Sequence, residues 1–387
     1  ITVRNGGSQN LDKVAHGNEE VIEARFADAA FFMKEDNRHT IEEFVPQLDT
    51  MIFHPKLGSM LEKTRRVTIL TENLVKPLGL NKEDAAAALE AAALCKADLV
   101  TKMVVEMTSL QGVIGRYYAL KSGKSELTAW AIEEHYFPRF AGDKSPDTMA
   151  GFVVGLADRL DSLVGLFAVG MAPSGTKDPF GLRRAAIGLV QNLTVKCIDI
   201  DLRESLKSAA ALLPVKVSPE KLSACLEFIT ERFENMLLEE GKRYDVVKAV
   251  LVELAYNPSL AVKNIDELAK WTIRKDWNEI LPAFARCVRI TRDLKEVYKT
   301  NPDNFKDAQE KKLFEEFSKT DKKIGVSNSA DVFLTHFIDM IPAINSFFDT
   351  VLVMAEDVKE RENRLGLLQK IAGLASGKAD LSLLEGF

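Results

Sequence analysis

The chain has 387 residues, of which 46% are hydrophobic and 28% charged, and its formal net charge at pH 7 is −6. This length suffices for two or three domains, each with its own hydrophobic core. The acidic balance excludes a protein coated with basic residues that binds nucleic acid indiscriminately, but it permits a local basic stripe. No run of 18 uncharged apolar residues occurs, so the sequence predicts no transmembrane helix.

The opening residues ITVRNGG are typical of a strand, and the chain begins with isoleucine rather than methionine. We therefore expect a fragment of a longer polypeptide, in which the lack of a targeting peptide is uninformative. Helical periodicity follows, because Val21, Ile22, Phe26 and later apolar residues recur at steps of one, three or four. The same periodicity covers the segments 82–107, 125–137, 148–169, 181–196, 218–240, 244–256, 262–300, 305–319, 331–341 and 345–374. The sequence predicts a multidomain, predominantly all-α fold.

Proline-containing segments mark the expected domain boundaries. LLPVKVSPEKL (212–222) contains two prolines and ends a long helical block. A helix is expected to restart there, with Ser218 as N-cap and Pro219 at its first position. The expected regions are a remnant of a preceding domain at 1–39, a helical domain at 40–215, a helical connector at 216–275 and a C-terminal helical domain at 276–387.

The stretch GMAPSGTKDPFGLRR (170–184) is close in composition to a phosphate-binding loop, with two glycines followed by Thr176 and Lys177. A nucleotide-binding P-loop needs a strand before it and a lysine ahead of its hydroxyl residue. Here helical periodicity precedes the loop and the Thr-Lys order is reversed. The sequence therefore argues against a nucleotide-binding P-loop, and Asp178 is expected to cap the helix that follows.

Two interpretations of this loop remain open. In the first, the loop is a joint between packed helices, and Arg183 and Arg184 pair with Asp158 or Asp161. In the second, Lys177, Arg183 and Arg184 cluster near a helix N-terminus and attract a phosphodiester backbone.

Metal and nucleophile motifs are missing from the sequence. Neither a CxxC pair nor a disulfide framework is formed by Cys95, Cys197, Cys225 and Cys287, which suits a reducing compartment. No HxxxH, HExxH or Cys/His cluster involves His16, His39, His54, His135 or His336, so no zinc site is predicted. No GxSxG nucleophile motif occurs either.

Three aspartates on apolar helical segments are the remaining metal candidates. Asp98, Asp158 and Asp161 either face one another around a divalent cation or pair with Lys96, Lys102 or Arg159. HD phosphohydrolases have a His…His-Asp…Asp layout of this kind. No adjacent His-Asp pair exists in this chain, and the corresponding position reads Ala97-Asp98. We therefore expect no metal ligand set.

A basic stripe is predicted near the C-terminus. In LPAFARCVRITRDLKEVYK (281–299), Arg286, Arg289 and Arg292 recur at steps of three and so share one side of a helix. The later segment 347–371 adds Phe347, Phe348, Arg361, Asn363, Arg364 and Lys370. Such a stripe is either a solvated helix face or an arginine and aromatic surface that holds single-stranded RNA.

Several long stretches together resemble the β subunit of the bacterial-type tetrameric glycyl-tRNA synthetase. They run in the order of that family across nearly the whole chain, and the most specific are TKDPFGLRR and LQGVIGRYYA. The stretches are FHPKLGSMLEKTRR (53–66), LCKADLVTKMVVEMTSLQGVIGRYYA (94–119), AIEEHYFP (131–138), LADRLDSLVGLFAVGMAPSGTKDPFGLRRAAIGLVQ (156–191), LLEEGKRYDVVKAVL (237–251) and FFDTVLVMAEDVKERENRLGLLQKI (347–371).

The resemblance implies a fold and a role. Residues 40–215 would form an HD-type domain whose metal dyad is degenerate, and residues 276–387 an anticodon-binding helical domain. ATP and Mg²⁺ would be used by the separate α subunit, so this part of an α2β2 glycine–tRNA ligase would hold no cofactor and no catalytic site. A plastid stroma, with a mitochondrion as a second location, or a bacterial cytoplasm fits a bacterial-type enzyme.

The partners implied are glycine tRNA and the α subunit, with no membrane. The residues expected at the anticodon end are Arg286, Arg289, Arg292, Arg361 and Arg364. Those expected nearer the acceptor or elbow of the tRNA are Lys177, Arg183, Arg184 and Arg116. The alternatives are an HD-type metal-dependent phosphohydrolase and a non-enzymatic helical scaffold.

Overall fold

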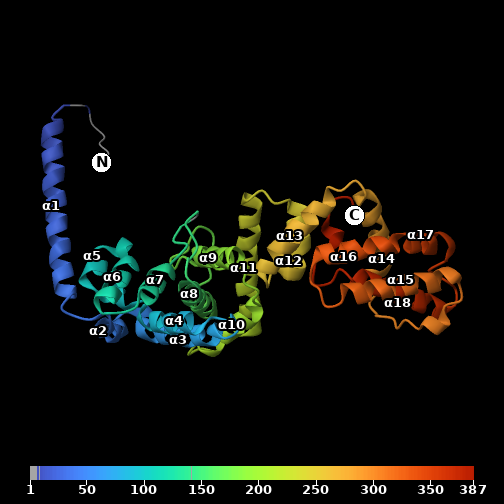
Figure 1. The fold of residues 1–387 in the computed structure, drawn as a ribbon, viewed down its shortest axis with the longest axis horizontal. Coiled ribbons are helices and arrows are strands. Elements are labelled where there is room, and N and C mark those ends of the chain that lie inside the picture. Colours follow the sequence, from blue (N-terminus) through green and yellow to red (C-terminus); the bar gives the residue numbers. More distant parts are fainter. Residues whose placement is uncertain (1–6, 8, 141) are drawn as a thin grey trace. The chain divides into compact units, whose positions relative to one another are not determined.

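The computed structural model describes residues 7, 9–140 and 142–387, and they form two compact helical units (Figure 1). Unit 1 comprises Ile1–Asn192 and Leu206–Leu222, and unit 2 comprises Leu193–Ser205 and Ser223–Phe387. The strand expected in ITVRNGG lies outside the described residues, apart from Gly7. The predicted all-α class is confirmed, because helices dominate both units.

The elements wholly inside unit 1 are α1 (Leu11–Asp36), α2 (Ile41–Phe44), η1 (Val45–Thr50), β1 (Ile52–His54), β2 (Gly58–Ser59), α3 (Met60–Val75), α4 (Lys82–Leu94), η2 (Ala97–Val100), α5 (Lys102–Glu106), η3 (Thr108–Leu110), α6 (Val113–Lys121), α7 (Glu126–Glu134) and α8 (Met149–Ala168). Three helices of the described chain have residues in both units, namely α9 (Leu182–Val195), α10 (Leu202–Ala211) and α11 (Pro219–Glu239). The elements wholly inside unit 2 are α12 (Tyr244–Leu254), α13 (Pro258–Thr272), α14 (Trp277–Thr291), η4 (Pro302–Asn304), α15 (Ala308–Ile324), α16 (Ala330–Phe337), η5 (Ile338–Met340), α17 (Ile341–Thr350), α18 (Val358–Gly373) and η6 (Leu381–Leu383).

Most predicted helices are found, but three long ones are interrupted. The segment 82–107 breaks after Leu94, the segment 262–300 divides into α13 and α14, and the segment 345–374 divides into α17 and α18. At the last break, α17 ends at Thr350 and residues 353–354 form a turn, although the side chains of 351–355 still alternate between buried and exposed. Asp357 then starts α18 by accepting hydrogen bonds from two backbone N–H groups. Apolar periodicity continues across such breaks because both sides still face the core.

Unit 1 is built around α8. Nearly all of this helix is buried, and Phe152, Leu160 and Leu163 are at most 1% exposed. Helices α3, α4 and α7 pack against it. Several core positions of α4 are alanines, and such small side chains allow close approach of neighbouring helices.

A short antiparallel hairpin precedes α3 and was not predicted. In its register, Ile52 pairs with Ser59 and His54 pairs with Gly58. Ser59 and Glu62 then form a capping box, because the Ser59 hydroxyl accepts from the Glu62 N–H and the Glu62 carboxylate accepts from the Ser59 N–H. This cap fixes where α3 starts and therefore which of its side chains face α8.

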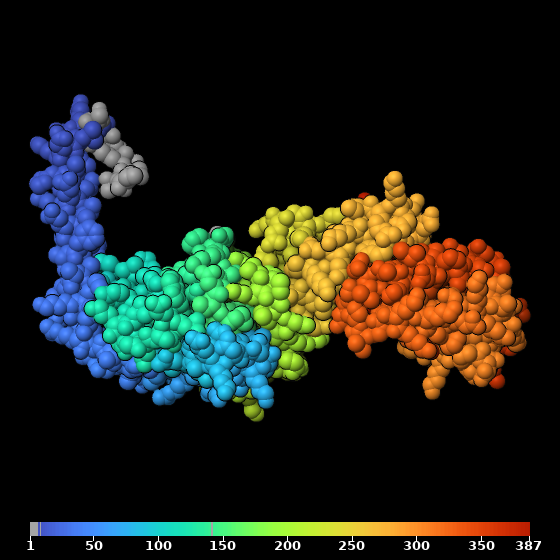
Figure 2. Space-filling view, viewed as in Figure 1, coloured from blue at the N-terminus to red at the C-terminus, as the bar shows by residue number. Residues whose placement is uncertain are grey.

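Helix α1 is almost entirely exposed. Asp36, at its last position, is its only buried described residue, and Figure 2 shows the helix exposed along most of its length. Asp36 accepts hydrogen bonds from the backbone N–H groups of Lys102 and Met103, and from the Tyr118 hydroxyl. These bonds fix the C-terminal end of α1 to α5 and α6.

Unit 2 has an aromatic core. The Phe284 ring lies 5.8 Å from Phe333 and 5.5 Å from Phe337, both in edge-to-face geometry. Of the connector expected at 216–275, residues 223–275 belong to this compact unit and residues 216–222 to unit 1. The Trp271 indole N–H donates to Asp331, and Asn264 accepts from the Ala330 N–H, so α13 is bound to the start of α16.

Among the described residues, no helix combines the length and hydropathy that crossing a bilayer requires.

Candidate functional site

A buried ionic centre joins α3 to α8 in unit 1. Lys63 and Arg66 are three residues apart on α3 and therefore share a face. The Lys63 Nζ lies 3.0 Å from Asp158 Oδ1 and 3.0 Å from Asp161 Oδ2. Arg66 Nε lies 2.6 Å from Asp161 Oδ1, and Asp161 is only 1% exposed. Two cations therefore neutralise the Asp161 carboxylate inside the unit.

Lys96, which precedes η2, completes this centre. Its Nζ lies 3.0 Å from Asp158 Oδ2 and 2.9 Å from His135 Nε2. The His135 Nδ1 lies 2.6 Å from the Ile132 carbonyl, so Nδ1 donates its proton there and Nε2 accepts from the ammonium. Burial and the Lys96 charge lower the pKa of His135 well below its ordinary value, which keeps the imidazole neutral. Burial alone would raise the pKa of Asp158, but Lys63 and Lys96 hold it well below its ordinary value.

The three candidate metal aspartates do not converge. The Asp98 Oδ2 accepts hydrogen bonds from the N–H groups of Gly112 and Gly115, at 2.5 and 3.1 Å, while two lysine ammonium groups surround Asp158. No group of three His, Cys, Asp or Glu side chains suited to a metal occurs in the part of the chain that the structure describes. The ammonium groups of Lys63 and Lys96 occupy the positions next to Asp158 that a metal cation would need.

The predicted partners of these aspartates were right only in part. Lys96 does pair with Asp158, but Lys102 pairs with Glu35. Arg159 donates to the backbone carbonyls of His135, Gly155, Tyr136 and Phe137 instead of to a carboxylate. The alternative in which Arg183 and Arg184 pair with Asp158 or Asp161 is wrong, since Lys63, Arg66 and Lys96 hold those carboxylates.

Asp98 predicts a pH dependence of stability. Burial raises the pKa of its carboxyl from 3.8 to about 6, and its Oδ1 has no hydrogen-bond partner among the described residues. Between these two pH values the folded state keeps a proton that the unfolded chain has lost, so the free energy of unfolding falls as the pH rises through this window. In Asp98→Asn this loss should vanish. The free energy of unfolding of the wild type should fall relative to that of the variant by about 2 kcal/mol between pH 4 and pH 6.5, measured by urea unfolding. Parallel pH profiles for the two proteins would contradict this assignment.

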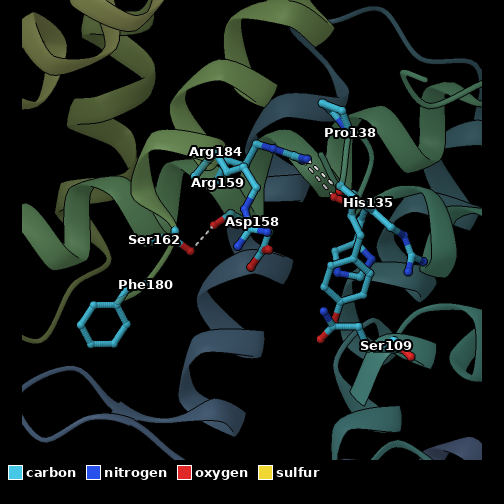
Figure 3. Close-up of a pocket in the computed structure, with 13 residues that line it drawn as sticks. Ser109, His135, Pro138, Asp158, Arg159, Ser162, Phe180 and Arg184 are labelled. Carbon is cyan, nitrogen blue, oxygen red and sulfur yellow. Dashed lines mark hydrogen bonds between the residues drawn. The ribbon is translucent and has the colours of Figure 1, made fainter. Parts of the chain in front are cut away.

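A cavity of about 400 Å³ opens beside the ionic centre (Figure 3). It lies between the segment after α7, the middle of α8 and the start of α9, with η3 contributing from another side. Figure 3 shows Asp158 and Ser162 between Phe180 and His135. The charged and titratable side chains that line it are His135, Tyr136, Arg139, Asp158, Arg159 and Arg184.

The loop 170–184 is a connection between two helices, as the sequence predicted. Helix α8 ends at Ala168, directly before the loop, so no strand precedes it. Helix α9 begins only at Leu182, yet the Asp178 carboxylate still caps it by accepting from the N–H groups of Leu182 and Arg183, at 2.8 and 2.9 Å. The Arg183 guanidinium donates to the Gly175 carbonyl, which ties the loop to the helix start.

The four cations predicted nearer the acceptor or elbow of the tRNA differ in environment. Lys177 and Arg184 are exposed. Arg183 is half-buried, with its guanidinium on Gly175. Arg116 pairs with Glu133 at 2.6 Å and stacks 4.0 Å from the Trp130 ring. Of these four, Arg184 alone lines the described cavity.

The predicted basic stripe of unit 2, Arg286, Arg289 and Arg292, lies along the C-terminal half of α14. Arg286 lies 4.5 Å from the centre of the Phe348 ring and contacts Asn345 and Asp349. Arg289 and Arg292 are exposed. The helix ends at Thr291, so Arg292 is its C-cap, and Lys295 and Lys299 lie beyond it. An arginine stacked on an aromatic ring beside exposed cations is an arrangement that binds nucleic-acid backbones and bases.

Arg364 requires a correction. It is 5% exposed, and its guanidinium is paired with Asp307, Glu310 and Glu360. A side chain held in this way cannot reach an RNA without breaking a buried ion network, so we assign Arg364 a structural role. Arg361 is half-buried and donates to the Ala355 carbonyl at 3.2 Å.

Two family models match this chain, one over its N-terminal part and one over its C-terminal part. The family model described as glycyl-tRNA synthetase beta subunit matches residues 1–252. The chain belongs to this family. A second model, the DALR anticodon binding domain, matches residues 280–377, which extend from within α14 to beyond the end of α18. The Arg286 stripe of this member of the glycyl-tRNA synthetase beta subunit family therefore lies inside the anticodon-binding match.

Relatives of this family are similar along the whole chain. The Arabidopsis thaliana protein named glycine–tRNA ligase, chloroplastic/mitochondrial 2, is 39% identical over 389 residues, which cover 100% of this chain and 36% of that protein. The glycine–tRNA ligase beta subunits of Moorella thermoacetica and Clostridioides difficile are 38% and 37% identical, over 99% of this chain. The matches span 57% and 56% of those proteins, so the chain corresponds to about half of each bacterial relative.

Sequence reasoning missed two groups of residues at the buried centre. Lys63 and Arg66 lie inside a stretch that carries the resemblance, and their spacing of three on an amphipathic helix that begins with a capping box was a usable signal. The role of Arg159 as a donor to carbonyls had no signal, because backbone carbonyls are present at every position.

Proposed function

We propose that this chain is the tRNA-binding part of the β subunit of a glycine–tRNA ligase. It positions glycine tRNA and recognises its anticodon, while aminoacylation takes place on the α subunit. The observation that carries this proposal is the surface made by Arg286, Phe348, Arg289 and Arg292 inside the region that matches the anticodon-binding family. The names of the relatives support the amino acid and the substrate.

The chemistry of this surface suits an RNA loop. Anticodon bases are unstacked in a loop, so guanidinium planes and aromatic rings can stack on them while exposed arginines pair with phosphates. Phosphate contacts set the orientation of the tRNA, and base contacts select it. Arg361 and the less exposed Arg183 and Arg116 remain weaker members of the proposed set.

The rest of the holoenzyme is also part of the proposal. The chain would work in an α2β2 assembly, with ATP and Mg²⁺ used by the α subunit. Unit 1 would contain an HD-type domain whose metal dyad is degenerate, and the ammonium groups of Lys63 and Lys96 around Asp158 support this interpretation. The similarity to a plant enzyme named for both organelles and to bacterial enzymes supports an organellar or bacterial location.

A salt titration tests the proposed function. Binding of the chain to glycine tRNA and to the same tRNA with a substituted anticodon is measured between 50 and 200 mM salt by filter binding. We expect tighter binding to glycine tRNA by at least about tenfold, with a strong salt dependence for both tRNAs. Equal affinity for the two tRNAs at every salt concentration would instead indicate a scaffold without anticodon recognition.

A further inference from the structure

The ionic centre of unit 1 carries more positive than negative charge. Its carboxylates are Asp158 and Asp161, and Asp98 lies near enough for the Lys96 charge to act on it. Four buried cationic side chains surround them, namely Lys63, Arg66, Lys96 and Arg159. Two further guanidinium groups, of Arg139 and Arg184, line the adjoining cavity. A buried excess of cations is costly unless anions compensate it, because the surroundings are poorly polarisable.

Arg159 is the clearest source of the excess. It is 7% exposed, and its hydrogen bonds to Phe137 and His135, at 2.7 and 2.9 Å, go to neutral carbonyls. The slot that holds it depends on two glycines: an ideal Cβ at Gly155 would lie 2.8 Å from Arg159 Nη1, and one at Gly188 would lie 2.9 Å from Nε. Carbonyls satisfy its donors without neutralising its charge, and Asp158, the carboxylate that acts on it, is already paired with Lys63 and Lys96, so part of its field extends into the cavity.

The two remaining arginines bring donors to the cavity. The Arg139 Nη2 is buried and has no hydrogen-bond partner among the described residues. The Arg184 side chain folds back over Gly181, another lining residue, and an ideal Cβ there would lie 2.9 Å from its Nη2. No carboxylate in the described part of the chain pairs with either guanidinium group. A buried donor without a partner, next to a polar cavity, indicates a missing acceptor.

We propose that this cavity binds a phosphate group, held by Arg139 and Arg184 in the field of Arg159. A doubly charged oxyanion would both accept from the free guanidinium donors and offset the excess charge. The volume of about 400 Å³ has room for a phosphate together with the group that it esterifies. This site is separate from the anticodon-binding surface of unit 2 and does not depend on the function proposed for it.

Phosphate binding is tested on the full chain by isothermal titration with inorganic phosphate, and with AMP as a larger phosphate ester. Saturable binding is expected, and Arg184→Gln should weaken it by about tenfold, because one charged donor pair is lost. The matched control is Arg65→Gln, which removes the same charge from an exposed side chain on α3 of the same unit, outside the lining of this cavity. The control should change the affinity by less than twofold.

Two results would contradict phosphate binding in this cavity. Absence of saturable binding, or equal weakening in Arg184→Gln and Arg65→Gln, overturns the proposal. Arg139→Lys is a second variant, which keeps the charge but loses the planar donor pair, and it should also weaken binding. Circular dichroism confirms that each variant is folded.

Competition with tRNA identifies the source of the phosphate. If saturating phosphate displaces glycine tRNA, and Arg184→Gln weakens both, the cavity holds a phosphodiester of the tRNA. If tRNA stays bound at saturating phosphate, the ligand is a free phosphorylated molecule. Both results keep the phosphate site, and neither depends on anticodon recognition.

Discussion

Replacing Arg286, Arg289 and Arg292 together with alanine is expected to weaken binding of glycine tRNA by about two orders of magnitude at low salt. Each arginine that pairs with a phosphate releases a counterion on binding, so the slope of log affinity against log salt should fall by about two units when three contacts are lost. The folding cost should be small, because the side chains of Arg286 and Asp349 are 37% and 68% exposed and such pairs contribute little to stability.

A matched control uses the same unit and the same change in charge. Lys311, Lys312 and Lys322 are exposed on α15, away from the α14 stripe in sequence. Their triple alanine variant should keep the affinity within about threefold and leave most of the salt slope intact. If both triple variants lose affinity and slope equally, binding depends on overall charge and the α14 stripe is not the site.

Replacing Asp161 with alanine is expected to lower the free energy of unfolding of unit 1 by about 3–5 kcal/mol. The substitution leaves Arg66 without its carboxylate and Lys63 with only Asp158, both inside the core. Removing one member of a buried ion pair costs this much because the remaining charge stays desolvated. The measurement is hydrogen exchange of α8 peptides at increasing urea, which reports on unit 1 alone.

Glu72→Ala is the control for this prediction. Glu72 is an exposed carboxylate on α3, the same helix that carries Lys63 and Arg66. Its loss should change the stability by less than about 0.5 kcal/mol. A loss below about 1 kcal/mol in Asp161→Ala would mean that water reaches the ionic centre and that it contributes little to the fold.

The helices of the chain, and some of their first residues and caps, could be predicted from the sequence. Apolar residues at helical spacing predicted most helices, the Ser218-Pro219 pair predicted the start of α11, and Asp178 predicted a helix cap. These signals work because a helix turn and its cap involve residues only three to five positions apart. The family resemblance was readable for a similar reason, since long stretches such as TKDPFGLRR occur as continuous segments.

The pairing of charges was decided only by the tertiary structure. Lys63 is 95 residues from Asp158 in sequence, and Arg364 is 54 residues from Glu310. Sequence spacing ranked neither pair above the many other combinations of cations and carboxylates. Arg364 therefore looked like part of an exposed stripe, although α15 buries it, and Arg159 looked like a salt-bridge partner, although carbonyls hold it.

The sequence by itself determined that this chain is helical, that it belongs among glycyl-tRNA synthetase β subunits and that its basic stripe begins at Arg286. Only the tertiary structure decided which cations remain free to bind a ligand. Burial and pairing depend on which distant side chains meet, and the packing of helices against one another sets those meetings. A guanidinium group that meets carboxylates in the packed unit, as Arg364 does, forms a core ion pair. One with an N–H donor that meets no acceptor among the described residues, as in Arg139, is available to a ligand.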